Sequence, residues 1–255
     1  MKLKYKIKKR YMFKFLKTTE PIYGNGAIYF DYAGVGIVQV DASHVAMVNT
    51  FLDRQVFERY EVLSEPFYLD YESLLEALQP FRFDDELEIV FDFSQDSIDV
   101  KISVEHGNKK TYFWQSDELL DGEVTSLPEL SGLDNSFELE NEDIRLLTKY
   151  NSECLRFQTL SEHGLKVSTD KDDRQPTDYQ VYMEILIESE SVKELKQNAR
   201  SLYASDYLRN ISKTFNKTQT FSIVYGDDYP TQVNFERENG AISGFYYIAP
   251  RIESR

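Results

Sequence analysis

Residues 71–91, YESLLEALQPFRFDDELEIVF, share a pattern with residues 205–225, SDYLRNISKTFNKTQTFSIVY. Aligned without a gap, each stretch is typical of a helical segment followed by an alternating strand, with apolar residues at matching positions. At a similar spacing, Gly34-Val35 aligns with Gly164-Leu165. Because the self-similarity covers both halves of the chain in order, it predicts two duplicated domains. The matching residues are Leu74, Phe81, Leu87, Ile89, Val90 and Phe91 in the first stretch and Leu208, Phe215, Phe221, Ile223, Val224 and Tyr225 in the second.

Short alternating segments dominate the rest of the chain, which has 255 residues and is rich in Tyr and Phe. Such segments, bounded by turn residues, are typical of strands, and examples lie at residues 27–30, 87–93, 98–104, 179–187 and 221–225. Helical spacing occurs at about residues 9–17, 71–79, 142–149 and 205–213. The pattern therefore predicts an α+β fold in which each half contributes two helices and several strands.

A segment with little periodicity separates the two halves. It carries Asp117, Glu118, Asp121, Glu123 and Pro128, a composition that is typical of a linker. We therefore expect an N-terminal domain at residues 1–116, a connecting linker at residues 117–130 and a C-terminal domain at residues 131–255.

Positive charge is gathered on the predicted helices of an acidic chain. The chain has 29 Lys and Arg against 44 Asp and Glu, a formal net charge of −15, yet its first seventeen residues include no acid. Basic side chains gathered on one surface can face phosphates even when the whole protein is negative. Each pair taken alone is equally compatible with a solvated face. Basic residues one turn apart are Arg10 with Lys14 and Lys17, Arg145 with Lys149, and Arg209 with Lys213, whereas the second helix instead carries Glu72 and Glu76.

No arrangement of residues indicates an enzyme strongly. His44 lies within four residues of Asp41 and Ser43 on what reads as an alternating strand, where three side chains cannot converge on one atom. No zinc-ligand spacing and no glycine-rich phosphate loop is present. Acid clusters at residues 84–86, 172–173 and 227–228 leave a metal-dependent hydrolase as the remote enzymatic alternative, although turns collect such residues too. We expect no catalytic residue, metal or cofactor, and no membrane span, because no apolar run approaches roughly 20 residues.

Two motifs near the ends of the chain carry a resemblance. The first comprises Gly34-Val35, residues 40–48 (VDASHVAMV) and residues 57–61 (FERYE), and the second comprises Tyr229-Pro230 and residues 246–253 (YYIAPRIE). In order and spacing they resemble the proliferating cell nuclear antigen family of sliding clamps, in its archaeal and eukaryotic form. The sequence between them matches mainly in pattern, so the resemblance covers roughly the whole chain.

The resemblance implies a fold and a role. It implies two similar DNA-clamp domains, each with two helices on packed antiparallel sheets, in a trimeric ring with pseudo-sixfold symmetry. The helices would line the hole and contact the phosphates of double-stranded DNA without reading its sequence. The implied function is that of a processivity factor without enzymatic activity, located inside the cell in the cytoplasm or nucleoid, or in the nucleus of a eukaryote. The DNA-facing residues implied are Lys9, Arg10, Lys14, Lys17, Arg145, Lys149, Arg209, Lys213 and Lys217.

The same resemblance implies docking of a DNA polymerase, a clamp loader and ligase or nuclease clients. These would bind an apolar groove through short peptides in which a glutamine precedes aliphatic and paired aromatic anchors. Core and linker packing is the alternative role for several of the residues concerned. The implied groove residues are Val40, His44, Val45, Leu127, Pro128, Pro230, Tyr247, Ala249 and Pro250.

Ring closure is expected to use two alternating segments that would otherwise leave sheet edges exposed. These are residues 109–114 of one subunit, including Phe113, and about residues 179–187 of the next. A homotrimer is the main expectation. The alternative is a subunit of a heterotrimeric or specialised clamp, whose interface strands would pair with a different chain.

Overall fold

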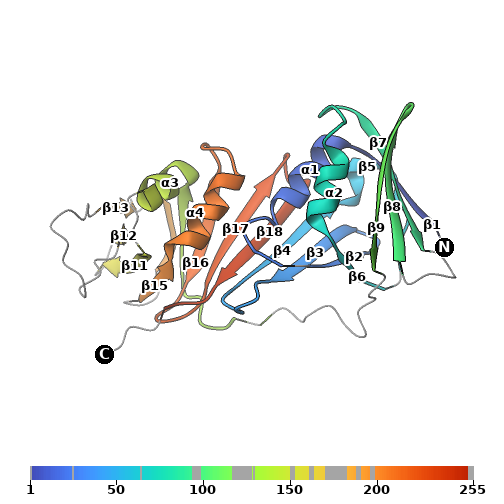
Figure 1. Ribbon diagram of the computed structural model, residues 1–255. Coiled ribbons are helices and arrows are strands. Elements are labelled where there is room, and N and C mark those ends of the chain that lie inside the picture. The colour runs from blue at the N-terminus through green and yellow to red at the C-terminus, as the bar shows by residue number, and fades with distance from the viewer. Residues whose placement is uncertain are drawn as a thin grey trace. The chain divides into compact units, whose positions relative to one another are not determined.

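The computed structural model describes residues 2–24, 26–63, 65–93, 99–116, 128, 130–149, 153–160, 164–169, 183–187, 191–195 and 199–251 (Figure 1). The chain divides into two compact units. The first comprises Met1–Ala42, Val48–Leu127 and Glu236–Gly244, and the second comprises Ser43–Met47, Pro128–Phe235 and Phe245–Arg255. Most of the predicted linker, residues 117–127 and 129, lies outside the described residues.

The first unit contains two helices and two groups of antiparallel strands. One sheet has the order β5-β1-β7-β8-β9, and the other group runs β4-β3-β2-β6. The elements are β1 (Lys2–Lys8), α1 (Lys9–Lys17), β2 (Gly26–Phe30), β3 (Gly34–Val40), β4 (Ala46–Asp53), the short helix η1 (Arg54–Val56), β5 (Phe57–Arg59), β6 (Phe67–Leu69), α2 (Tyr71–Leu78), β7 (Glu86–Phe93), β8 (Asp99–His106) and β9 (Lys109–Ser116).

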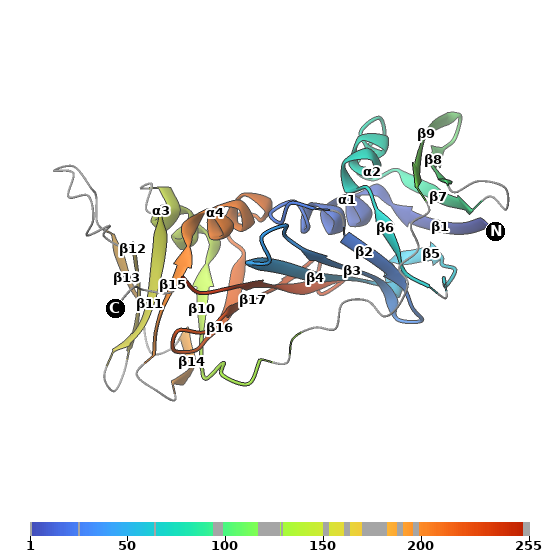
Figure 2. The same ribbon diagram turned by 60° about the horizontal axis from the view of Figure 1, so that its bottom comes forward.

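The second unit repeats this plan. Its strands form a group in the order β14-β10-β16-β17 and a four-stranded sheet in the order β13-β12-β11-β15. The elements are β10 (Asn135–Glu140), α3 (Asn141–Lys149), β11 (Cys154–Leu160), β12 (Gly164–Thr169), β13 (Glu184–Ile187), β14 (Val192–Leu195), β15 (Arg200–Ala204), α4 (Ser205–Thr214), β16 (Thr220–Tyr225), β17 (Thr231–Arg237) and β18 (Ile242–Ile248). The end of β17, the turn after it and the start of β18, residues 236–244, count with the first unit. Figures 1 and 2 show α1 beside α2 in the first unit and α3 beside α4 in the second.

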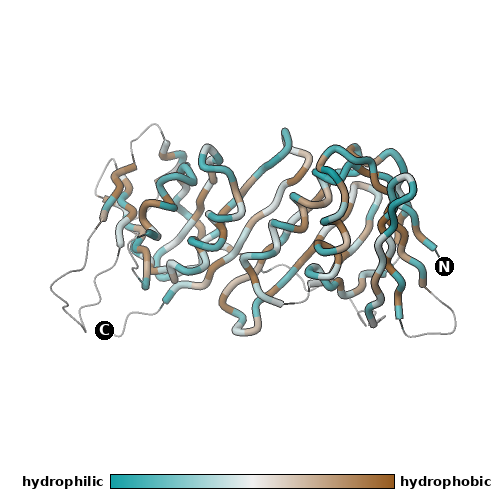
Figure 3. The backbone as a smooth tube through the Cα atoms, turned by 45° about the horizontal axis from the view of Figure 1, so that its top comes forward, coloured by the Kyte–Doolittle hydropathy of each residue, from teal (hydrophilic) through white to brown (hydrophobic). Residues whose placement is uncertain are grey.

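Alternating sequence produces strands with one buried face. In β1, Leu3, Tyr5 and Ile7 are buried while the lysines between them are more exposed, and Tyr5 pairs with Ile89 of β7. This alternation is visible as changes of hydropathy along the strands in Figure 3. The buried faces bring aromatic rings together, such as Tyr5 and Phe30, whose ring centroids lie 4.9 Å apart. Such pairs contribute about 0.5–1.5 kcal/mol each beyond their buried area.

Helices α1 and α3 begin with equivalent backbone hydrogen bonds. The first N–H groups of a helix have no partner within it. In α1 the N–H groups of Lys9 and Arg10 donate to carbonyls 2.8 and 3.0 Å away, and in α3 those of Asn141 and Glu142 donate to carbonyls 2.7 and 3.2 Å away. The acceptors, Asp85 and Phe83 for α1 and Gln219 and Lys217 for α3, occupy matching positions in the two aligned sequence stretches.

The predicted α+β class and the four predicted helices are confirmed, with each helix within one residue of its expected bounds. The strand expected at residues 179–187 is described only as β13, because residues 179–182 lie outside the described part of the chain. The predicted strand through Asp41, Ser43 and His44 is wrong. β3 ends at Val40 and β4 begins at Ala46, and His44 turns the chain with a positive φ of 55°.

Candidate nucleic-acid interface and partner site

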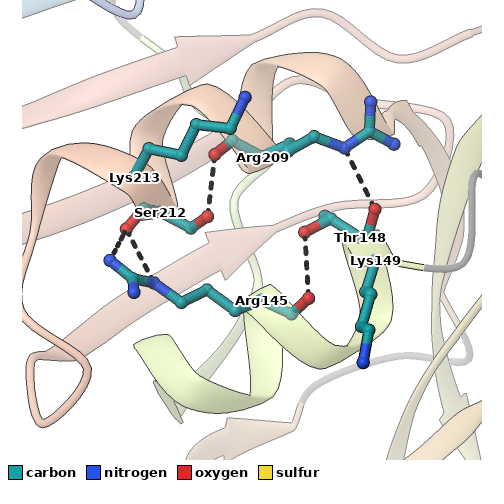
Figure 4. Close-up of a pocket in the computed structure, with 6 residues that line it drawn as sticks. All are labelled: Arg145, Thr148, Lys149, Arg209, Ser212 and Lys213. Carbon is teal, nitrogen blue, oxygen red and sulfur yellow. Dashed lines mark hydrogen bonds between the residues drawn. The ribbon is translucent and has the colours of Figure 1, made fainter.

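A shallow depression of about 550 Å³ lies between α3 and α4 (Figure 4). Each helix contributes two basic residues one turn apart, because i and i+4 positions share a helix face. Four of the depression's six lining residues are basic and none is acidic. Its lining residues are Arg145, Thr148, Lys149, Arg209, Ser212 and Lys213.

Two of these basic residues hold the helices together reciprocally. The Arg145 guanidinium donates to the carbonyl oxygens of Ser212, at 2.8 Å, and Phe215, at 2.7 Å, at the end of α4. The Arg209 Nε donates to the carbonyl of Thr148, at 3.0 Å, at the end of α3 (Figure 4). The last carbonyls of a helix lack intrahelical donors and favour cations. These arginines therefore have a structural role while keeping their charge at the surface.

We expect Arg145→Ala to lower the free energy of unfolding by about 1.5–3 kcal/mol, because hydrogen bonds from a charged donor to half-buried carbonyls are lost. Lys149→Ala, one turn further along the same helix and exposed, should change it by less than about 0.5 kcal/mol. Denaturant unfolding of both variants gives the comparison. Equal losses would contradict the structural role of Arg145.

Unlike the two arginines, Lys149 and Lys213 make no hydrogen bond between the helices within the described ranges. Both side chains are exposed. Within the described ranges, neither ammonium group has a recorded hydrogen bond or ion pair, and Figure 4 draws both free of dashed lines. These two lysines are therefore available to an anion without loss of an internal contact.

The basic residues of α1 face acids instead. Lys14 contacts Glu238, Lys17 contacts Glu20, and Arg10 lies 3.8 Å from Asp84. Helix α2, packed beside α1, exposes Glu72 and Glu76, as its sequence predicts. Three basic side chains of α1 thus have acidic partners. In the second unit Arg209 likewise pairs with Asp206 at 2.5 Å, whereas Lys149 and Lys213 have no such partner among the described residues.

The prediction that Lys9 faces DNA is wrong. Lys9 is only 7% exposed, and its Nζ donates to the carbonyl of Phe81 at 2.6 Å, just beyond the end of α2. Burial lowers the pKa of this ammonium, and nearby Asp85 opposes that effect. Asn141 performs the same task in the second unit, donating to the carbonyl of Phe215 at 3.1 Å. Lys9 therefore closes a helix end and does not present its charge to solvent.

Lys217 lies beside the second helix pair but has an internal partner. Its Nζ is 3.3 Å from Glu142 Oε1, and both side chains are more than half exposed. An exposed pair of this kind is worth about 0–1 kcal/mol, so it can open at little cost. Lys217 stays a predicted DNA-facing residue.

Most of the predicted groove residues belong to the second unit, where the C-terminal segment is held on two sides. The Ala249 N–H donates to the carbonyl of Val45 at 2.8 Å, and the Arg251 N–H donates to Leu202 at 2.7 Å. Pro250 lies between these anchors, and the Tyr247 ring packs against Phe245 at an interplanar angle of 47°, with ring centroids 4.7 Å apart. Val45, Pro230, Tyr247, Ala249 and Pro250 are all half-buried, whereas His44 and Pro128 are exposed.

Two predicted groove residues stand apart from this cluster. Leu127 lies outside the described residues, and Val40 belongs to the first unit. The structure thus brings His44 and Val45 together with the C-terminal segment within one unit, although about 200 residues separate them in sequence.

Both predicted interface segments contain an edge strand of a described sheet. β9 is terminal in the first unit's five-stranded sheet, and β13 is terminal in the second unit's four-stranded sheet. Each exposes large apolar side chains: Tyr112 and Trp114 are 52% and 59% exposed on β9, and Leu186 is 62% exposed on β13. Phe113 is half-buried on the opposite face of β9. An edge strand with exposed apolar residues is a site for pairing with another chain.

No protein-family model matches the chain. It is 26% identical over 229 residues to the DNA polymerase sliding clamp of Methanococcoides burtonii, covering 87% of this chain and 86% of that protein. It is 24% identical to the DNA polymerase sliding clamp of Thermoplasma acidophilum, covering 88% of each. Its fold is similar to that of A. fulgidus PCNA, in a structure where that protein is bound to the C-terminal region of FEN-1. The TM-score is 0.79 and the sequence identity 19%, and the match covers 99% of this chain and 100% of that one. The PCNA of Thermococcus kodakaraensis gives a TM-score of 0.76 at 18% identity, covering 98% and 100%.

The duplicated helix-and-sheet units and these relatives define a DNA sliding clamp. Over most of its length the chain is similar to the DNA polymerase sliding clamps, and its fold is that of the proliferating cell nuclear antigens. The relatives confirm the predicted class, a processivity factor without enzymatic activity, and none supports the hydrolase alternative. No helix within the described ranges is both long and apolar enough to cross a membrane.

Proposed function

We propose that this chain encircles double-stranded DNA in a ring of three copies and keeps replication enzymes on the duplex. The observation that carries the proposal is the basic α3–α4 surface, where Lys149 and Lys213 are exposed in a chain of net charge −15. Contacts between these side chains and phosphates are independent of sequence, so they permit movement along any duplex.

Retention on circular DNA tests encirclement directly. Clamps placed on nicked circular DNA by their loader should stay bound at a salt concentration that breaks phosphate contacts, because the ring is closed around the duplex. Cutting the circle should release them. Release from the uncut circle at the same salt concentration would show binding without enclosure.

The ring would close by pairing β9 of one subunit with β13 of the next. Both strands end a sheet within the described part of the chain and expose apolar side chains, which suits pairing with another chain. A homotrimer should have a solution mass of three times 29.9 kDa. A solved structure with a TM-score of 0.73 to this chain is a PCNA2–PCNA3 complex from Sulfolobus tokodaii, so pairing with a different clamp chain is the second candidate.

We expect Phe113→Ala to shift the trimer toward monomer on dilution, because it weakens the packing that supports β9 at the interface. Phe83→Ala, which truncates an aromatic residue that is 44% exposed and lies outside β9, is the matched control. Analytical ultracentrifugation over a dilution series measures both variants. An unchanged mass for Phe113→Ala would contradict this interface.

The surface around Val45 and the C-terminal segment is the proposed docking site for a polymerase, a clamp loader and ligase or nuclease clients. Small, half-buried apolar residues on a segment anchored at both sides suit a short peptide with aromatic anchors. With these partners, the protein would act inside the cell, in the cytoplasm or nucleoid, or in the nucleus of a eukaryote.

A further inference from the structure

One acidic residue outside the helices contacts the central lysine of α1. Glu238 lies in the turn between β17 and β18, and its carboxylate accepts a hydrogen bond from Lys14 Nζ. The two side chains are only 19% and 26% exposed. The ion pairs of Arg10 and Lys17 are more open, since their side chains are 36% and 35% exposed and their acidic partners 86% and 40%. The Lys14 pair is therefore the best protected of the three.

The turn holds Glu238 in place. Glu238, Asn239 and Gly240 have φ values of 51°, 58° and 85°, a left-handed run that is unfavourable for a glutamate. The turn is fixed at its end by the carbonyl of Ala241, which accepts from the Asp53 N–H at 2.9 Å. Because the surrounding structure maintains an unfavourable conformation, Glu238 is positioned and does not move freely.

Lys14 is also held from other directions. Its ammonium lies 5.8 Å from the centroid of the Phe83 ring, a cation–π distance, and its backbone carbonyl accepts from Arg237 at 3.4 Å. A lysine with a carboxylate partner and an aromatic neighbour has little to gain from a phosphate. No equivalent acid is recorded beside Lys149 or Lys213 in the described part of the second unit.

We propose that Glu238 masks Lys14, so that α1 gives up a phosphate contact and the duplex is held mainly by Lys149 and Lys213. The proposal rests on the proposed function. Glu238 acts as a positioning residue, since it would touch Lys14 and not the DNA. Its consequence is that the two units of each subunit contribute unequally to DNA contact and the clamp holds the duplex loosely.

Removing the Glu238 charge should strengthen DNA binding. We expect Glu238→Gln to raise the affinity for a short labelled duplex about fivefold to tenfold at about 0.1 M salt, which is the gain from one further phosphate contact. The slope of log affinity against log salt should become more negative by about 0.9 for each Lys14 that engages. Glu238→Asn, whose side chain tolerates a positive φ better, should behave in the same way if the glutamine variant is unstable.

Two comparisons isolate the effect. Glu88→Gln makes the same change in net charge on the face of β7 opposite its buried residues, where Glu88 pairs with Lys4 at 3.2 Å, and should leave affinity unchanged. Lys14→Gln should remove the gain in the Glu238→Gln protein, because no ammonium group is left at that position to contact a phosphate.

The outcomes separate the inference from the proposed function. If the wild type binds duplex DNA and the Glu238→Gln and Glu88→Gln proteins have equal affinity for it, the proposal that Glu238 masks Lys14 is wrong while the proposed clamp function stands. If the wild type binds no duplex at the lowest salt concentration and is not retained on circular DNA, the proposed function fails. A gain in Glu238→Gln that survives Lys14→Gln would overturn the assignment to Lys14.

Discussion

Charge reversal of Lys149 and Lys213 together is expected to abolish duplex binding by the clamp. Each lost phosphate contact lowers affinity about eightfold at about 0.1 M salt, and the new carboxylates add repulsion, so we expect a loss of roughly a hundredfold or more. Fluorescence anisotropy with a labelled duplex measures the loss, and stimulation of a polymerase should fall with it. Both side chains are exposed, so the fold should be kept.

The matched control reverses Lys2 and Lys4. They pair with Asp92 at 2.9 Å and with Glu88 at 3.2 Å on the outer face of the five-stranded sheet. The net charge changes equally, and the loss of exposed pairs costs about 1 kcal/mol or less each. Binding should remain near the wild-type level. Processive synthesis by the Lys149→Glu, Lys213→Glu protein at ordinary salt would show that the second unit does not carry the DNA contact.

Truncation after Ile248 is expected to eliminate binding of a client peptide. It removes the Ala249 N–H that donates to Val45, the adjacent Pro250 and the Arg251 N–H that donates to Leu202. Without these anchors one wall of the docking surface is missing, and an aromatic anchor would remain in water. Calorimetry with a peptide in which a glutamine precedes aliphatic and paired aromatic residues measures the loss.

Arg251→Ala is the control for that truncation. It keeps the backbone contact to Leu202 and removes only the exposed ion pair with Glu153, in which Arg251 Nη1 lies 3.4 Å from the carboxylate. Peptide affinity should change little, and the trimer mass should be the same in both proteins. Equal peptide affinity in the truncated and full-length chains would place the docking site elsewhere.

Much of the fold could be predicted because it depends on local periodicity. Alternation in β1 and helical spacing in α1 each place apolar residues on one face, and burial of that face gives the element its position. The repeated stretch that begins at residue 71 predicts the second helix of each unit and the strand after it for the same reason. The turn at His44 could not be predicted, because a positive φ leaves no periodic trace.

The roles of individual basic residues were harder to predict. Arg145 has the one-turn spacing to Lys149 expected of solvent-facing charges, and the resemblance places Lys9 among the DNA-facing residues. Both nevertheless donate to carbonyls at the end of a neighbouring helix. Sequence spacing shows which face of a helix a residue shares but not which acceptors another element brings to that face. For Glu238 the sequence contains one indication of local structure: the Asn239-Gly240 pair that follows it is typical of a tight turn. Nothing local links that turn to Lys14.

The helix-end contact made by Lys9 in one unit and Asn141 in the other has a consequence for how this architecture diverges. The long Lys9 side chain and the short Asn141 side chain donate to the equivalent carbonyls of Phe81 and Phe215. The backbone hydrogen bonds at the start of α1 and α3 also have equivalent donors and acceptors. What the scaffold requires there is a hydrogen-bond donor of sufficient reach, and both an ammonium group and an amide satisfy that requirement. The two halves can therefore diverge in residue identity at this position while the geometry of the helix end is kept, and the helix end is a suitable junction at which to join halves of different clamps.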